Sequence, residues 1–252
     1  LYGSAELNYD QWLFLTYTNR NDWSSTLLST NRSYTYPSVS LSYVVSEMLE
    51  SMGTSLPSWM NYLKLRGSYA SVGNDMGPYR LYNGYNISKD PLGHTIASKE
   101  NLLKNPGVVN ELLKSTEFGA EMRFIKNRVG LDFTWYKSNA TNQLIELPLD
   151  PMSGYSRKII NAGNIQNKGI EIMLDARILQ NPSGLSWNAK LNYSKNENLV
   201  IDIAKSEGVE SYGLGSFDNL SLRAVNGQLY GVIYGTKFKR VEDPNSSSNG
   251  QL

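Results

Sequence analysis

Two carboxylates near the middle of the chain are the first candidates for chemistry. Apolar and polar residues alternate on either side of Lys126 and Asn127, which predicts a hairpin in which Glu121 faces Asp132. Opposed side chains on paired strands have Cβ atoms about 5 Å apart, near the spacing of a retaining glycosidase carboxylate pair. We favour the alternative, a polar pair on a barrel wall with Arg123 diagonally across, and we assign no catalytic residue.

Other catalytic and metal-binding arrangements find little support in the residue types. His94 is the single histidine and cysteine is absent, which leaves no basis for a Ser-His-Asp triad, a thiol nucleophile or a thiolate metal site. Asp90, Asp75 and Asn74 carry oxygens suited to calcium, but their spacing is not that of an EF-hand. We interpret them as turn residues, leave calcium binding by a loop open, and predict no enzyme, no cofactor and no resident metal.

Aromatic residues in two long connections are the better candidates for binding. Tyrosine rings stack on sugars and offer a hydroxyl group, and arginine adds charged donors. The alternative is that these rings pack the loops against one another or against a partner. The predicted substrate-binding residues are Tyr79, Arg80, Tyr82, Tyr85, Tyr155 and Arg157.

Period-two alternation identifies the elements that must position these residues. The hairpin register is internally consistent, because Phe118 would face Trp135 and Met122 would face Leu131, and a slip of one residue would destroy every such match. We expect a short helix between 47 and 60, ending before Pro57. The predicted antiparallel strands lie near 3–9, 12–20, 36–46, 61–72, 115–125, 129–137, 168–179, 185–197 and 229–239.

Each strand has one apolar face and one polar face, and the two environments follow from which face is outside. In a transmembrane barrel lipid contacts the apolar outside and water lines the polar inside. We therefore place on the convex face Val39, Leu41, Tyr43, Phe118, Met122, Leu131, Phe133, Ile170, Ile172, Leu174, Trp187 and Leu191. We place on the concave face Arg66, Glu117, Glu121, Asp132, Glu171, Asp175 and Lys190.

The connections between strands alternate in length. Short ones at 10–11, 126–127 and 180–184 and a medium one at 46–60 separate long ones at 19–35, 73–114, 138–167 and 199–228. Outer-membrane barrels have short periplasmic turns and long extracellular loops. The fold class we predict is all-β: an antiparallel up-and-down transmembrane β-barrel, present as an open partial barrel with long extracellular loops.

Composition excludes several other classes. The 252 residues are 40% hydrophobic, with no run near the roughly 18 apolar residues that a spanning helix needs. Net charge is +1, which offers no basic field for nucleic acid. The chain begins in mid-pattern and ends in a polar run at 243–249, so we interpret residues 1–252 as one partial barrel domain of a longer protein.

Several short motifs give the chain a resemblance to a known family. Each motif is weak alone, but their order extends over nearly the whole chain. They are NRNDWSS at 19–25, YPSVSLSY at 36–43 leading to Ser46-Glu47, LKLRGSY at 63–69 leading to Gly73-Asn74, EFG at 117–119, YK at 136–137, NAGN at 161–164, NKGIE at 167–171, GQLYG at 227–231 and YG at 234–235. The set resembles the SusC/RagA group of TonB-dependent outer-membrane transporters, and departs from it at Leu229 and Asn21, where proline and a basic residue are commoner.

The resemblance implies a function and partners. It implies TonB-energised import of oligosaccharides or peptides across the outer membrane of a Gram-negative cell, with a SusD-like surface lipoprotein over the loops and TonB-ExbB-ExbD acting through a plug. The plug, TonB box, N-terminal extension and closing strands are expected outside this chain. The alternatives are a passive porin-like channel and a soluble carbohydrate-binding module, whose apolar stripes would pack onto a second sheet.

Overall fold

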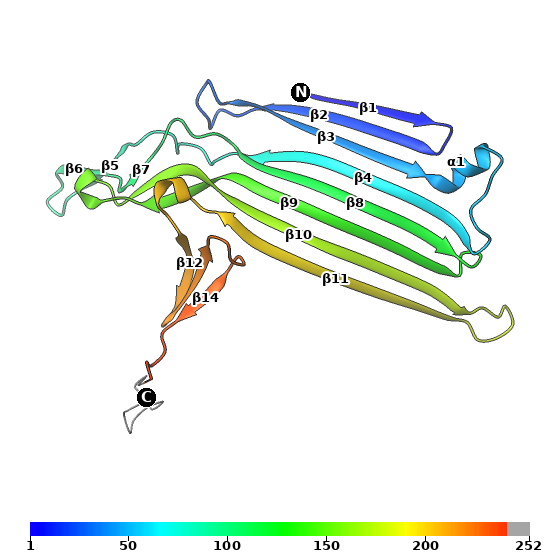
Figure 1. The fold of residues 1–252 in the computed structure, drawn as a ribbon. Coiled ribbons are helices and arrows are strands. Elements are labelled where there is room, and N and C mark those ends of the chain that lie inside the picture. The colour runs from blue at the N-terminus through cyan, green and yellow to red at the C-terminus, as the bar shows by residue number, and fades with distance from the viewer. Residues whose placement is uncertain (241–252) are drawn as a thin grey trace.

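Antiparallel strands form one broad, open sheet in the computed structural model, which describes residues 1–240. The nine-stranded sheet has the order β1-β2-β3-β4-β8-β9-β10-β11, and short β7 pairs with β10 in parallel. Figure 1 shows these strands side by side in a curved layer. The strands are β1 (Tyr2–Tyr9), β2 (Leu13–Trp23), β3 (Ser33–Val44), β4 (Met60–Asn74), β7 (Leu102–Leu103), β8 (Glu111–Phe124), β9 (Val129–Pro148), β10 (Arg157–Leu179) and β11 (Trp187–Asp202).

The pairing register is the one that the alternation predicts. Phe118 faces Trp135, Glu121 faces Asp132 and Phe124 faces Val129. Lys126 and Asn127 both have positive φ, 53° and 63°, as a two-residue type I′ turn requires. The partial antiparallel sheet and its central hairpin are therefore confirmed.

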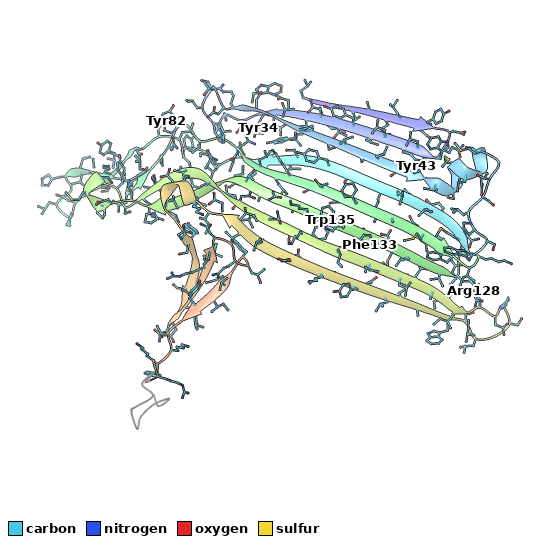
Figure 2. The ribbon with its side chains drawn as sticks, viewed as in Figure 1. Tyr34, Tyr43, Tyr82, Arg128, Phe133 and Trp135 are labelled. Atoms are coloured by element: carbon cyan, nitrogen blue, oxygen red, sulfur yellow. The ribbon has the colours of Figure 1, made fainter. Side chains whose placement is uncertain are left out.

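Apolar side chains continue across the sheet in rows. One row is Leu63, Met122, Leu131, Leu174 and Leu191, on five successive strands. None of these residues belongs to a buried core, and Phe118 on the same face is 57% exposed. Figure 2 shows Phe133 and Trp135 on this sheet, with no second layer stacked on it there. The apolar face thus has no protein partner among the described residues, contrary to what a soluble sandwich would show.

The two ends of the sheet differ. The turn end carries the tight turns after β1 and β8, the connection after β10, and the helix α1 (Val45–Ser51), which confirms the expected short helix. The loop end carries β5 (Tyr85–Lys89), β6 (Thr95–Lys99), η1 (Pro151–Ser153), η2 (Lys205–Glu207), β12 (Ser211–Phe217), β13 (Leu220–Val225) and β14 (Val232–Gly235). Figure 1 shows these additions gathered at one end of the strands.

Aromatic rings cluster at the turn end. Trp12 makes edge-on contacts with Tyr9 and Tyr43, at 5.2 and 5.5 Å between centroids. Trp59 stacks on Phe124 at 5.8 Å. Such rings are favoured at a membrane–water interface because one side is apolar and the other polar.

Several predicted loops contain regular structure. The expected loop at 138–167 is wrong, because β9 continues to Pro148 and β10 begins at Arg157. The expected loop at 73–114 holds the β5–β6 hairpin and β7, and that at 199–228 holds β12 and β13. The strand expected at 229–239 is reduced to β14, which pairs with β13 in a separate three-stranded sheet. The polar run at 243–249 lies outside the described residues.

The buried cores lie at the loop end. One contains Leu147, Val200, Ile203, Ala204 and Ala224; the other contains Leu27, Met76, Val108 and Ile159. They fix the additions of the loop end on the ends of β9, β10 and β11. Among the described residues, no helix is both long enough and apolar enough to cross a membrane.

Candidate functional site

Ion pairs cover the polar face of the central strands. Arg66 on β4 donates to both oxygens of Asp132, at 3.0 and 2.7 Å, and to Thr134 at 2.6 Å. The arginine side chain passes directly over Gly119, which has no side chain to block it. A Cβ on that glycine would stand 2.4 Å from the arginine Nε. The polar face is therefore a cross-strand network whose geometry depends on a glycine.

The opposed carboxylates each have their own cation. Arg123 donates to Glu121 at 3.0 Å and to Asp175 at 2.8 Å. Asp132 forms its salt bridge with Arg66 instead. Two carboxylates that are separately paired with arginine match the wall-pair interpretation. A general acid would need its pKa raised by burial or by an unpaired neighbouring carboxylate.

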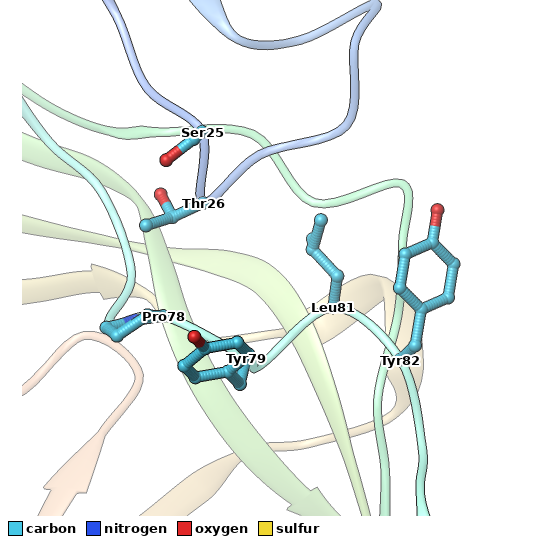
Figure 3. Close-up of a pocket in the computed structure, with 6 residues that line it drawn as sticks. All are labelled: Ser25, Thr26, Pro78, Tyr79, Leu81 and Tyr82. Carbon is cyan, nitrogen blue, oxygen red and sulfur yellow. The ribbon is translucent and has the colours of Figure 1, made fainter.

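Two of the predicted binding tyrosines line a hollow at the loop end. The hollow measures about 420 Å³ and its walls come from two connections, those after β2 and β4. Figure 3 shows the hydroxyl groups of Ser25 and Thr26 on one side, with Pro78 and Tyr79 on the other. Its lining is Ser25, Thr26, Pro78, Tyr79, Leu81 and Tyr82.

Tyr79 is held out into solvent by a strained backbone. Its side chain is 94% exposed and its φ is +61°, a conformation uncommon for a bulky residue. Lys104 Nζ donates to the Tyr79 carbonyl at 3.2 Å and is itself paired with Glu100 at 2.8 Å. Backbone strain of this kind clusters at ligand clamps and active sites, and the binding role of Tyr79 stays a prediction.

Asp75 joins the two connections that form the hollow. Its carboxylate accepts hydrogen bonds from Ser24 and, at 2.9 Å, from Thr26. The hydrogen bond from Ser24 is the main cause that holds the pKa of Asp75 below its ordinary value of 3.8, and burial opposes it. Leu81 then packs against the core that contains Leu27 and Val108, so the hollow rests on a fixed base.

The two predicted arginines meet at a carboxylate. Arg80 and Arg157 both bind Glu146, at 3.1 and 2.7 Å. Their charges are therefore engaged at a single position on β9. Lys99 lies over the ring of Tyr155, 3.5 Å from its centroid, so that ring is covered by a cation. Tyr85 stands apart, exposed on the β5–β6 hairpin.

The candidate calcium ligands are not brought together. Asn74 donates to Glu111 at 3.3 Å, and Asp90 accepts from His94 in the β5–β6 turn at 2.9 Å. That hydrogen bond is the main cause of a lowered pKa of Asp90. Among residues 1–240, no group of three or more His, Asp or Glu side chains is placed to hold a metal ion.

Sequence reasoning missed the polar half of the hollow. Ser25 and Thr26 lie in a run rich in serine and threonine that reads as an ordinary loop, and Glu146 lies in a segment expected to have no strand. A possible signal was the Gly-Pro-Tyr run at 77–79, since glycine and proline mark tight loops. Nothing local indicates that this loop meets residues 24–26.

An open antiparallel sheet with an uncovered apolar face, a polar ion-paired face and elaborations at one end defines the wall of a membrane β-barrel. A family model described as "TonB dependent receptor-like, beta-barrel" matches residues 1–246. The chain belongs to this family of outer-membrane receptors, which are not enzymes, and it is located in the outer membrane.

Curated relatives bear related names. The chain is 27% identical over 237 residues to TonB-dependent receptor P39 of Formosa agariphila, covering 92% of the chain and 22% of that protein. It is 24% identical over 227 residues to TonB-dependent receptor SusC of Bacteroides thetaiotaomicron, covering 82% of the chain and 21% of SusC. The resemblance to the SusC/RagA group is confirmed, and the chain spans less than a quarter of the length of these relatives.

Solved structures show the same fold. The RagAB peptide importer in its closed-closed state superposes with a TM-score of 0.75 at 22% identity, over 89% of this chain and 24% of that one. Its open-open state gives a TM-score of 0.70 at 21% identity, over 94% and 28%. The arrangement of strands in this chain is therefore that of part of a much larger barrel.

Proposed function

We propose that the chain is a section of the barrel of an active transporter that imports nutrient oligomers, either oligosaccharides or peptides, across the outer membrane. The observation that carries the proposal is the sheet with lipid-type side chains on one face and paired charges on the other. A wall of this kind encloses a passage and performs no chemistry itself. Energy would come from TonB-ExbB-ExbD through a plug encoded elsewhere in the protein.

The loop end is the proposed entry side. Outer-membrane barrels carry their long loops on the extracellular side, so substrate would meet the hollow of Tyr79 and Tyr82 before it reaches the barrel. Ser25 would donate to a sugar hydroxyl or a peptide carbonyl. Thr26, whose own proton goes to Asp75, would accept a hydrogen bond, and Tyr79 would supply a stacking surface. A SusD-like lipoprotein would cover this end and hold the substrate against it.

Membership of a TonB-dependent family favours energised import over a passive channel. The test uses the whole transporter in its own cells. Deletion of its gene should abolish growth on one class of oligomer, and depletion of TonB should do the same while the protein remains in the outer membrane. Uptake that survives loss of TonB would favour the passive channel instead.

The binding role of the hollow has a separate test. Tyr79→Ala in the whole transporter should weaken substrate binding by roughly two- to tenfold, the loss expected for one aromatic contact. Met152→Ala is the matched control, because Met152 is equally exposed at the loop end but lies outside the hollow. Equal affinities for the two variants would exclude the hollow without affecting the import proposal.

A further inference from the structure

The free edge of β11 marks where the barrel must continue. β11 pairs with β10 along one side over Trp187–Asp202. On its other side, the backbone hydrogen bonds within residues 1–240 are confined to the loop end: Val200 N donates to Gln228 O, Gly227 N to Val200 O and Tyr230 N to Asn198 O, at 2.8–2.9 Å. Leu199 and Leu229 form an antiparallel bridge there. The chain thus begins a new strand on β11 and then leaves it.

The departure occurs at Gly231. This residue has a φ of +88°, and beyond it Val232–Gly235 pairs with β13 as β14 over only four residue pairs. The divergence opens a groove between residues 195–199 of β11 and residues 227–232. Phe238, just beyond β14, is 83% exposed and Ile233 is 68% exposed.

We infer that in the whole transporter residues 232–239 lie along the free edge of β11 as the next membrane strand, after a one-residue bulge at Gly231. A glycine in the left-handed region is the residue that opens a G1 bulge. Residues 232–239 are the candidate for this edge because three hydrogen bonds around Leu229, from Val200, Gly227 and Tyr230, already fix the direction and position of the preceding residues on β11. Closure of a barrel also removes such edges.

The bulge sets which face each side chain takes. With it, Tyr234 lies opposite Lys195, Thr236 opposite Tyr193 and Phe238 opposite Leu191. Phe238 then extends the apolar row that ends at Leu191. On the polar face, Lys237 lies opposite Asn192 and Lys239 opposite Lys190.

Without the bulge the register fails. Lys237 would lie opposite Leu191 and Lys239 opposite Ala189, so two ammonium groups would point into lipid while Phe238 pointed into the polar interior. Because a shift of one residue exchanges the faces of a strand, the sequence of this segment fits β11 with the bulge and not without it. The inference concerns the architecture of the wall and holds whichever oligomer is imported.

Engineered cysteine pairs test the inference in the whole transporter in outer membranes, in a background without other cysteines. Lys195→Cys with Tyr234→Cys should cross-link rapidly with a short thiol reagent, as should the independent pair Leu191→Cys with Phe238→Cys. Leu174→Cys with Leu191→Cys is the positive control, since these residues face each other on β10 and β11.

Two further pairs detect the other arrangements. Cross-linking of Ser221→Cys with Tyr234→Cys would show that the segment stays on β13, where these residues are paired. Cross-linking of Ser194→Cys with Tyr234→Cys would show a strand without the bulge. Either result overturns the inference, and so does failure of both proposed pairs when the positive control reacts.

Discussion

The membrane sheet and the loop end differ in what covers their apolar side chains. Across the sheet, Leu131 and its neighbours in the same row lie on a face that no described residue covers, and we expect lipid to cover it. At the loop end, Leu147, Val108 and Val200 are almost fully buried by protein. The difference shows that a single chain is adapted to two solvents: where lipid is present the wall can be one layer thick, and where water surrounds it the chain must build its own core.

Truncating a leucine in each region should give the largest difference between the two. Leu147→Ala should cost about 2–5 kcal/mol of local stability, because a cavity remains in a packed core. Leu131→Ala should cost less, because acyl chains can fill the space. Hydrogen exchange of residues 200–226 in the whole transporter measures the first effect. Equal protection in the two variants would contradict the proposed division.

A charge on the lipid face should have the next largest effect. Leu131→Arg places a guanidinium on the apolar face two residues into β9, where it should cost at most the roughly 2–4 kcal/mol of membrane stability that such a charge costs at the bilayer midplane. Asn192→Arg is the matched control, because Asn192 lies one row away on the polar face. Folding titrations into bilayers would compare them, and similar losses would mean that the faces are assigned wrongly.

The polar face can be probed through its glycines. Gly119→Ala should displace Arg66, because the new Cβ would stand 2.4 Å from Nε, and should break its pairing with Asp132. We expect a loss of about 1 kcal/mol, the scale of a part-exposed ion pair. Gly3→Ala is the control, since nothing lies within 4 Å of its Cβ position. Thermal unfolding of the whole transporter measures both, and unchanged stability of the first variant would contradict the role of Arg66.

The smallest expected effect is at the base of the hollow. Ser24→Ala removes a hydrogen bond to Asp75 and should cost about 0.5–1.5 kcal/mol. The pKa of Asp75 is lowered in the folded protein, so its contribution is present above the unfolded pKa and is lost as pH falls through the folded one. The Ser24→Ala deficit should therefore be full at neutral pH and vanish in strong acid. Proteolysis of residues 24–32 against pH would show it; a deficit that persists in acid would exclude Asp75.

How much the sequence predicts depends on the solvent of each region. Strands within the membrane alternate in polarity, so their register, including Glu121 opposite Asp132, could be derived. The outer parts of β9 and β10 pack against protein on both faces, with Leu147 in one core and Ile159 in the other, and their alternation disappears. Asn139 and Asn164 pair there through their amides at 2.8 Å, and such asparagines are read as loop residues.

The binding candidates were predicted by type but not by arrangement. Tyr79 and Tyr82 do line one hollow, yet Arg80 and Arg157 meet at Glu146 and Tyr85 stands apart. Pairing across connections is a tertiary property. Residues 24–26 and 75–82 are separated by an entire hairpin of the sheet, and no local pattern links them.

The length of the longest strand determines how far the sheet extends beyond the membrane. β10 has 23 residues, and at about 3.3 Å per residue it is roughly 75 Å long. Tilted by about 45°, it rises roughly 53 Å, of which the apolar band accounts for about 25 Å. The wall thus extends beyond the apolar band of the bilayer by a distance comparable to the thickness of that band. A macromolecule too bulky to approach the lipid surface could still reach its rim.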